Sequence, residues 1–177
     1  MKSLLVFPAQ WYPTQPYLST PYLCAYLKSK GWDVSQRDFN IESYENFLSP
    51  TLLEKAVSKM DARLTTLKNN KSFSFKEKSL MDVLTTGIKF APTIISGVND
   101  AKNIMRTPER FFNFNDYKQA DMIIKSALKL VSDAYYPSIL TLSTFESGTR
   151  AEESTQRAAG FARNSDCNPF IDLYENV

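Results

Sequence analysis

The chain has 177 residues, about the length of one domain, and its 43% hydrophobic and 23% charged residues are typical of a globular protein. The 21 Lys and Arg residues against 19 Asp and Glu residues are too balanced to indicate nucleic-acid binding by charge. There is no histidine, and the two cysteines are far apart, which excludes a Ser-His-Asp triad and a four-cysteine metal site. The five glycines are too dispersed for a Gly-rich phosphate-binding loop. Composition therefore predicts no catalytic residue and no metal ligand.

Neither a membrane span nor a secretion signal is predicted. No stretch approaches the roughly 18 uncharged apolar residues that a membrane span needs. The first eight residues have a basic start, but their apolar run is too short for a signal peptide. Because the cysteines also lack the pattern of a disulfide framework, we expect a cytoplasmic protein without nucleic-acid or membrane partners.

The first forty residues have the pattern of a β-α-β unit. Residues 3–7 form a continuous apolar run, which predicts a strand buried on both faces of a parallel sheet, and Pro8 ends it. Residues 32–38 predict a second strand, more exposed because its centre is polar. A helix between two strands predicts a crossover connection, so the strands are expected to be parallel.

The connecting helix has recognisable end signals. Ser19 or Thr20 is expected to cap it, with Pro21 at its first position, where the missing N–H costs nothing. Gly31 supplies the left-handed residue that ends the helix, and Cys24 is expected to be a buried, inert thiol. Apolar residues at helical spacing are expected to share one face: Leu23, Tyr26 and Leu27.

Residues 43–136 are expected to form an all-helical block. Apolar spacing and capping residues predict helices over residues 50–67, 74–90, 93–106 and 108–112, and a last helix whose apolar stripe covers residues 117–131 and which ends at residues 135–137. Pro92 is expected to kink or end the second of these helices, and Asn115 to cap the last and strongest one. The apolar stripes indicate a packed core rather than a cofactor site.

Residues 137–177 are expected to form a connecting segment that ends in an unfinished helix. Residues 139–143 are β-prone, residues 152–161 predict a weak helix, and Asn168 with Pro169 starts a final helix that is cut short. Two parallel strands are also too few to hide a sheet. We therefore expect a fragment or amino-terminal segment of a longer protein. The predicted fold is α/β and predominantly helical: an incomplete flavodoxin-like (Rossmann-like) unit over residues 1–42, followed by a large helical insertion.

The loop after the first strand is the main candidate binding site. Ligands of open α/β sheets bind at the carboxyl ends of the strands. The loop offers hydrogen-bonding groups and flat apolar faces that suit a large planar ligand, from Gln10, Trp11, Tyr12, Pro13, Thr14, Gln15 and Tyr17. The alternative is a proline-stiffened loop whose aromatic side chains pack on the helical block.

Several acidic residues are weaker candidates. Asp38 ends the second strand, where an acid can accept a hydrogen bond from a ribose hydroxyl. Without a Gly-rich turn, capping of the next helix through Asn40 is the stronger interpretation. Paired carboxylates at residues 152–153, and at Asp172 with Glu175, have the composition of an acid/base pair, but solvated surface charge is the stronger interpretation.

Several short segments together resemble one family. They are Leu-Leu-Val-Phe-Pro at residues 4–8, Trp-Tyr-Pro at 11–13, Pro16, Pro-Tyr-Leu-Cys-Ala-Tyr-Leu at 21–27, Gly31 and Asp-Phe-Asn at 38–40. This run resembles the opening of the cobalamin-binding radical S-adenosylmethionine enzymes. Tyr-Tyr-Pro at residues 135–137 and Asn-Pro-Phe at 168–170 are similar to a passage that follows a helical insertion in some members.

The resemblance implies a role for the chain as the amino-terminal, non-catalytic part of such an enzyme. The rest of the polypeptide would be its partner, adding strands to the flavodoxin-like domain and a barrel. That barrel would carry S-adenosylmethionine and a four-iron four-sulfur cluster held by Cys-x-x-x-Cys-x-x-Cys. The implied cobalamin contacts are Gln10, Trp11, Tyr12, Pro13, Tyr17 and Asp38. Neither the cluster motif nor the cobalamin signature Asp-x-His-x-x-Gly is present in this chain.

Two other functions are compatible with the sequence. The first is a helical interaction module on a small α/β base, which would bind another protein through the helices of residues 50–131. The second is an independent small enzyme that uses carboxylates, although no convergent motif favours it.

Overall fold

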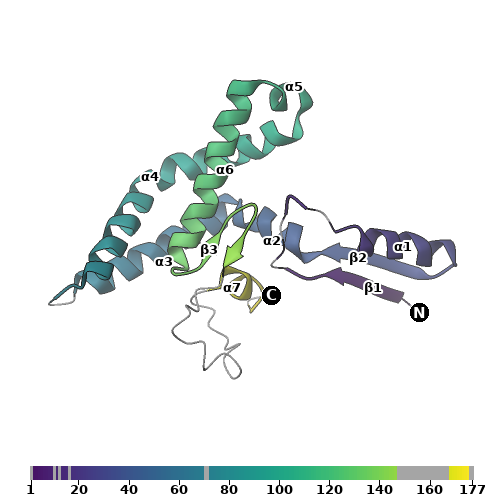
Figure 1. Ribbon diagram of the computed structural model, residues 1–177, viewed down its shortest axis with the longest axis horizontal. Coiled ribbons are helices and arrows are strands. Elements are labelled where there is room, and N and C mark those ends of the chain that lie inside the picture. The colour runs from purple at the N-terminus through teal and green to yellow at the C-terminus, as the bar shows by residue number, and fades with distance from the viewer. Residues whose placement is uncertain are drawn as a thin grey trace.

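The computed structural model describes residues 2–9, 11, 13–15, 17–69, 72–146 and 168–175. A small parallel sheet of β1 (Lys2–Phe7) and β2 (Asp33–Asp38), joined by α1 (Ser19–Ser29), precedes a block of helices. Figure 1 shows the sheet and α1 at one end of the molecule and the helical block at the other. The fold is α/β and predominantly helical, as predicted.

The two strands are parallel, with Lys2 opposite Asp33 and Phe7 opposite Asp38. Side chains alternate along a strand, and α1 packs on the face that carries the buried Val34. On the opposite face, Leu4 and Val6 are 53% and 42% exposed. The prediction that the first strand is buried on both faces is therefore wrong, because the described residues cover only one face of the sheet.

Helix α1 differs from its prediction at its start and on its buried side. It begins at Ser19, and Leu18 occupies the N-cap position without a side-chain cap. Cys24 is the buried residue of this helix, as expected for that thiol, and it lies against β2 with Sγ 3.9 Å from the carbonyl oxygen of Val34. The predicted apolar face is turned outward at Leu23 and Tyr26. Gly31 ends the connection with a φ of 81°, as predicted.

Helix α2 (Phe39–Phe47) follows β2 directly, at the place where a helix capped by Asn40 was expected. Asp38 is its N-cap, because its side chain accepts a 3.0 Å hydrogen bond from the backbone N–H of Ile41. Asn40, predicted as the cap, is instead inside the helix and buried. The extended conformation that an N-cap requires occurs at Asp38, the residue that pairs with Phe7 at the end of the sheet.

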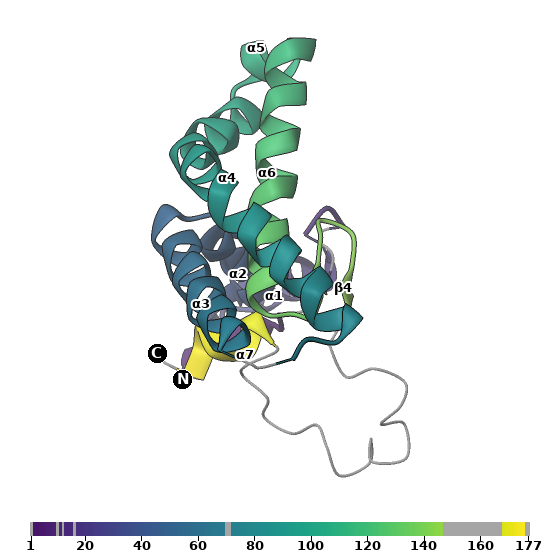
Figure 2. The same cartoon turned by 90° about the vertical axis from the view of Figure 1, so that its left-hand side faces the viewer.

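Four helices continue the block: α3 (Pro50–Lys68), α4 (Phe75–Arg106), α5 (Pro108–Phe111) and α6 (Phe114–Ala134). Ser49 caps α3, and Ser74 forms a reciprocal capping box with Glu77 at the start of α4, which confirms both predicted starts. Helix α4 continues through Pro92, and Figure 2 shows that it bends about midway. Proline has no N–H to pair and crowds the preceding turn, which explains the bend.

The cap of α6 is Asn113 rather than the predicted Asn115. The Asn113 side chain accepts hydrogen bonds from the backbone N–H groups of Asn115 at 3.0 Å and Asp116 at 3.3 Å. Asn113 has the extended backbone of an N-cap, whereas Asn115 already lies in the first turn. The prediction chose the wrong one of two asparagines that are separated by a single phenylalanine.

The core lies among α3, α4 and α6, which confirms that the apolar stripes pack together. Helix α7 (Pro169–Glu175) joins this core through Phe170, whose ring meets Phe47 edge-on at 4.9 Å. The β-prone segment forms only β3 (Ile139–Leu140), paired antiparallel with β4 (Phe145–Glu146). The weak helix predicted over residues 152–161 lies outside the described residues. Among the described helices, none combines the length and apolarity needed to cross a bilayer.

Candidate functional site

The loop between β1 and α1, called the strand-end loop below, lies at the carboxyl ends of the two parallel strands. The backbone N–H of Trp11 donates a 2.8 Å hydrogen bond to Oδ1 of Asn40 in α2. The hydroxyl of Thr14 donates to the carbonyl oxygen of Leu142, at 3.3 Å. The loop is therefore fixed to the end of β2 on one side and to the segment after β3 on the other.

Two aromatic side chains of this strand-end loop pack on each other. The rings of Trp11 and Tyr17 meet edge-on with centroids 6.2 Å apart, and Tyr17 stacks on Phe7 at 5.2 Å. Trp11 is 42% and Tyr17 is 50% exposed, while Pro13 between them is half-buried. These two rings offer flat apolar faces at the place where open α/β sheets bind ligands.

The remaining predicted contacts are distributed differently. Asp38 lies at the end of β2, beside this loop in the register of the sheet, and its carboxylate caps α2. Gln10 and Tyr12 lie outside the described residues. The structure thus brings Trp11, Tyr17 and Asp38 to one end of the sheet.

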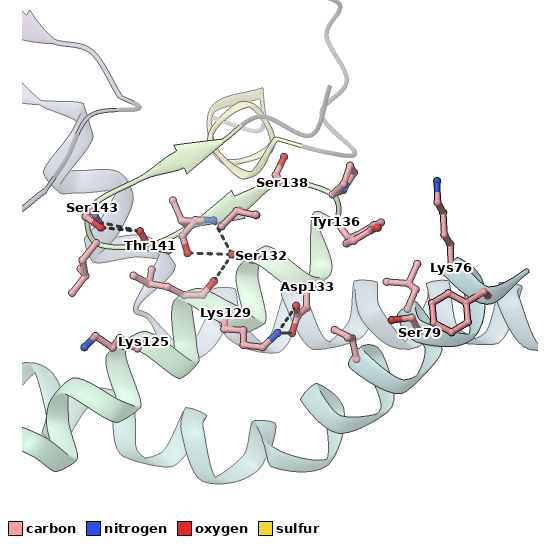
Figure 3. Close-up of a pocket in the computed structure, with 18 residues that line it drawn as sticks. Lys76, Ser79, Lys125, Lys129, Ser132, Asp133, Tyr136, Ser138, Thr141 and Ser143 are labelled. Carbon is pink, nitrogen blue, oxygen red and sulfur yellow. Dashed lines mark hydrogen bonds and ion pairs between the residues drawn. The ribbon is translucent and has the colours of Figure 1, made fainter. Parts of the chain in front are cut away.

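A second site, which the sequence did not reveal, is a cleft between α4 and α6. Its cavity has a volume of about 870 Å³, within the range of small-molecule sites. Figure 3 shows its walls: the first turns of α4, the second half of α6 and the segment that contains β3. The name α4–α6 cleft is used for this cavity and its lining residues, which are Phe75, Lys76, Ser79, Leu80, Val83, Lys125, Leu128, Lys129, Ser132, Asp133 and residues 136–143.

Ser132 fixes the wall formed by β3. Its Oγ accepts a 2.8 Å hydrogen bond from the backbone N–H of Leu140 and lies 3.1 Å from the carbonyl oxygen of the same residue. Thr141 Oγ1 accepts from the backbone N–H of Thr144 at 2.9 Å, which closes the turn to β4. The cleft therefore has a hydrogen-bonded wall rather than a loose one.

An ion pair lies in the middle of the α4–α6 cleft. Lys129 Nζ lies 2.8 Å and 2.9 Å from the two carboxylate oxygens of Asp133, as Figure 3 shows. Burial raises the pKa of Asp133 above its ordinary value, and the hydrogen bond from Lys129 opposes that rise. A second cavity of about 380 Å³ shares Val83 and this ion pair with the first and extends along α4 to Phe90 and Ile94.

The other predicted carboxylates have structural partners or lie elsewhere. Asp172 accepts a hydrogen bond from the hydroxyl of Tyr135, and Lys59 Nζ lies 3.7 Å from its carboxylate. Burial and this carboxylate together raise the pKa of Tyr135. Residues 152–153 lie outside the described residues. Within the described part of the chain, no group of three or more His, Cys, Asp or Glu residues is placed to hold a metal ion.

No signal in the sequence marks the α4–α6 cleft. Its lining comes from three segments that are distant along the chain, and its lysines resemble ordinary surface charges on amphipathic helices. The chain was also compared with family models, curated proteins and solved structures, and none of them matches it.

Proposed function

We propose that this chain is the amino-terminal, non-catalytic part of a radical S-adenosylmethionine enzyme, and that its β-α-β unit belongs to a flavodoxin-like, cobalamin-binding-like domain. The observation that carries the proposal is the strand-end loop. The segments that resemble this family supply β1, the loop and the end of β2, and the loop is fixed to Asn40 at the strand ends. This is the position where such folds bind ligands.

The uncovered face of the sheet supports the same proposal. Leu4 and Val6 are apolar and exposed on β1, and in the described part of the chain β1 pairs with β2 alone. Parallel sheets are normally covered on both faces and extended by further strands. Additional strands and helices from the rest of the polypeptide would cover Leu4 and Val6 and pair with the open edge of β1.

The exposed rings of Trp11 and Tyr17 stand at 75° to each other, so one ring would stack on a planar ligand such as a corrin and the other would meet it by its edge. Bound cobalamin supplies organometallic radical or group-transfer chemistry at its cobalt. In this proposal, the two rings hold and orient the corrin and exclude water from it, and Asn40 fixes the loop that carries Trp11. The sequence has no histidine, so this chain supplies no imidazole to the cobalt.

Corrinoid binding tests the ligand. Hydroxocobalamin is mixed with the complete polypeptide, and the bound corrinoid is measured by visible absorbance after gel filtration. We expect Trp11→Ala to weaken binding and Trp32→Ala to leave it unchanged. Trp32 is a matched control because it is 54% exposed, close to the 42% of Trp11, but lies at the amino ends of the strands. Equal effects of the two variants, or no bound corrinoid, contradict cobalamin binding.

The iron–sulfur cluster provides a separate test of the enzyme class. The complete polypeptide should contain Cys-x-x-x-Cys-x-x-Cys beyond the residues described here, and anaerobic reconstitution should load four irons and four sulfides onto it. A complete polypeptide without this motif contradicts the enzyme class. Corrinoid binding without the motif would leave a cobalamin-binding module as the function of the unit.

Protein binding through the helical block is the second candidate function, and one observation favours it. Phe112 and Phe114 are 82% and 72% exposed beside α5, which Figure 1 shows at an extremity of the molecule. Exposed aromatic patches of this kind mark interaction sites. If the partner is a second copy of the chain, sedimentation velocity will show concentration-dependent association that replacement of both phenylalanines by serine removes. A sedimentation coefficient independent of concentration contradicts self-association.

A further inference from the structure

The α4–α6 cleft has an apolar floor and an apolar mouth. Leu80, Leu128 and Leu140 lie buried beneath it, and the side chains of Phe75 and Ile139 stand exposed at its rim. An occupant with an apolar body would remove these two side chains from water, which is favourable in proportion to the area covered. The cleft therefore favours a ligand with an apolar body.

Charge at the cleft is unevenly distributed. Three lysines and one aspartate line the larger cavity. Lys129 is paired with Asp133, and Lys125 Nζ lies 2.7 Å from a carboxylate oxygen of Asp121. Lys76 has no ion pair with any described residue. Figure 3 shows Lys76 and Lys125 at opposite ends of the cleft, so the uncompensated positive charge is at the Lys76 end.

The cleft is also elongated. The smaller cavity shares Val83 and the Lys129–Asp133 pair with the larger one and reaches Phe90 and Ile94. From Lys76 to Phe90, helix α4 covers about 21 Å at roughly 1.5 Å per residue. A cation that has no ion pair among the described residues at one end, and mostly apolar surface leading from it past the Lys129–Asp133 pair, match a ligand with an anionic head and a long apolar tail.

We propose that the α4–α6 cleft binds a long-chain carboxylate, with its head paired to Lys76 and its acyl chain along Val83 toward Phe90. Ser79 is exposed on the next turn of α4 and lies within the same lining. Its hydroxyl supplies a hydrogen-bond donor beside the head group. This assignment is independent of cobalamin and of the iron–sulfur cluster.

Titration calorimetry with the full chain tests the charge and the length of the ligand. Dodecanoate is compared with dodecanol and with dodecyltrimethylammonium, which have the same tail and a neutral or a cationic head. We expect dodecanoate to bind at one site, more tightly than dodecanol and at least about tenfold more tightly than the cation. Equal binding of all three amphiphiles overturns the proposal and leaves a non-selective apolar surface. Saturable binding of an amphipathic peptide without dodecanoate binding also overturns it, in favour of a peptide groove.

Matched variants test the position of the head group. Lys76→Gln should weaken dodecanoate binding about fivefold, the value of one exposed ion pair. Lys78→Gln should not change it, because Lys78 is an exposed lysine of the same helix outside the lining. Identical affinities of the two variants overturn the pairing with Lys76. Val83→Trp should fill the channel and abolish binding. If that variant does not fold, the comparison of the two lysine variants still decides the proposal.

Discussion

The backbone N–H of Trp11 and the side-chain oxygen of Asn40 are 2.8 Å apart, although 29 residues separate them along the chain. Asn40 is buried, so its amide serves as an internal attachment point rather than a surface contact. This hydrogen bond ties the strand-end loop to α2.

Replacing Asn40 should release that loop. Asn40→Ala removes the acceptor of the Trp11 N–H, and the loss of one part-buried hydrogen bond costs about 0.5–1.5 kcal/mol. We expect a lower free energy of unfolding in urea and faster hydrogen exchange in residues 8–17. Asn46→Ala is the control, because its side chain makes an exposed 2.8 Å hydrogen bond to the carbonyl oxygen of Glu42 in the same helix. Unchanged exchange in the loop of Asn40→Ala would contradict this role.

Two asparagines at the start of α6 allow a direct test of its capping residue. Asn113→Ala should lower the free energy of unfolding by about 1 kcal/mol, because the N–H groups of Asn115 and Asp116 lose their acceptor. Asn115→Ala should change it by no more than about 0.5 kcal/mol. Thermal and urea unfolding of the pair measures both values. A larger loss in Asn115→Ala would reverse the assignment.

Two glycines of α4 should respond differently to alanine. A Cβ on Gly97 would lie 3.4 Å from Ile123, an ordinary contact, so Gly97→Ala should gain up to about 1 kcal/mol of helix stability. A Cβ on Gly87 would lie 2.5 Å from Cε of Met60, which is fully buried. Gly87→Ala must displace Met60, so its gain should be smaller or become a loss. Equal unfolding free energies for the two variants would contradict the close packing of α4 on α3.

Asp133 should give stability a specific pH dependence. Because burial raises its pKa above 3.8 in the folded chain, the folded chain holds this proton more tightly than the unfolded chain does. The stabilisation that this tighter proton binding gives the folded chain is therefore lost as the pH rises from about 3.8 through the folded-state pKa of Asp133. Asp133→Asn does not titrate, so the unfolding free energy of the parent minus that of the variant should fall over this interval. Urea unfolding at a series of pH values measures the difference, and a difference that is constant with pH would contradict the raised pKa.

The parts of the fold that the sequence predicted correctly depend on local signals. Ser49 before Pro50, and Ser74 three residues before Glu77, are complete helix-start signatures, and both are confirmed. The extent of helix α2 escaped prediction because half of its buried residues are polar. Asn40 and Ser43 are buried there through hydrogen bonds to residues distant in the chain, Trp11 and Tyr174. Hydrogen bonds to distant residues leave no trace in the spacing of apolar residues along the sequence.

The two candidate sites also differ in whether a local sequence pattern marks them. The strand-end loop was predictable because its position follows from the order of strand, loop and helix. The α4–α6 cleft depends on how α4 and α6 meet β3, which brings Lys76, Lys129 and Ile139 to one cavity. Their separation along the chain leaves no local pattern.

The aromatic contacts of α7 have a consequence for how the helical block is connected. Tyr174 donates a 2.9 Å hydrogen bond to the carbonyl oxygen of Phe39, the first residue after β2, and the two rings lie 5.3 Å apart. The polypeptide thus returns, 135 residues later, to the point where it left the sheet. The segments that lead into and out of the helical block therefore meet beside the end of β2, so a change in the length of its outer helices need not displace the strands.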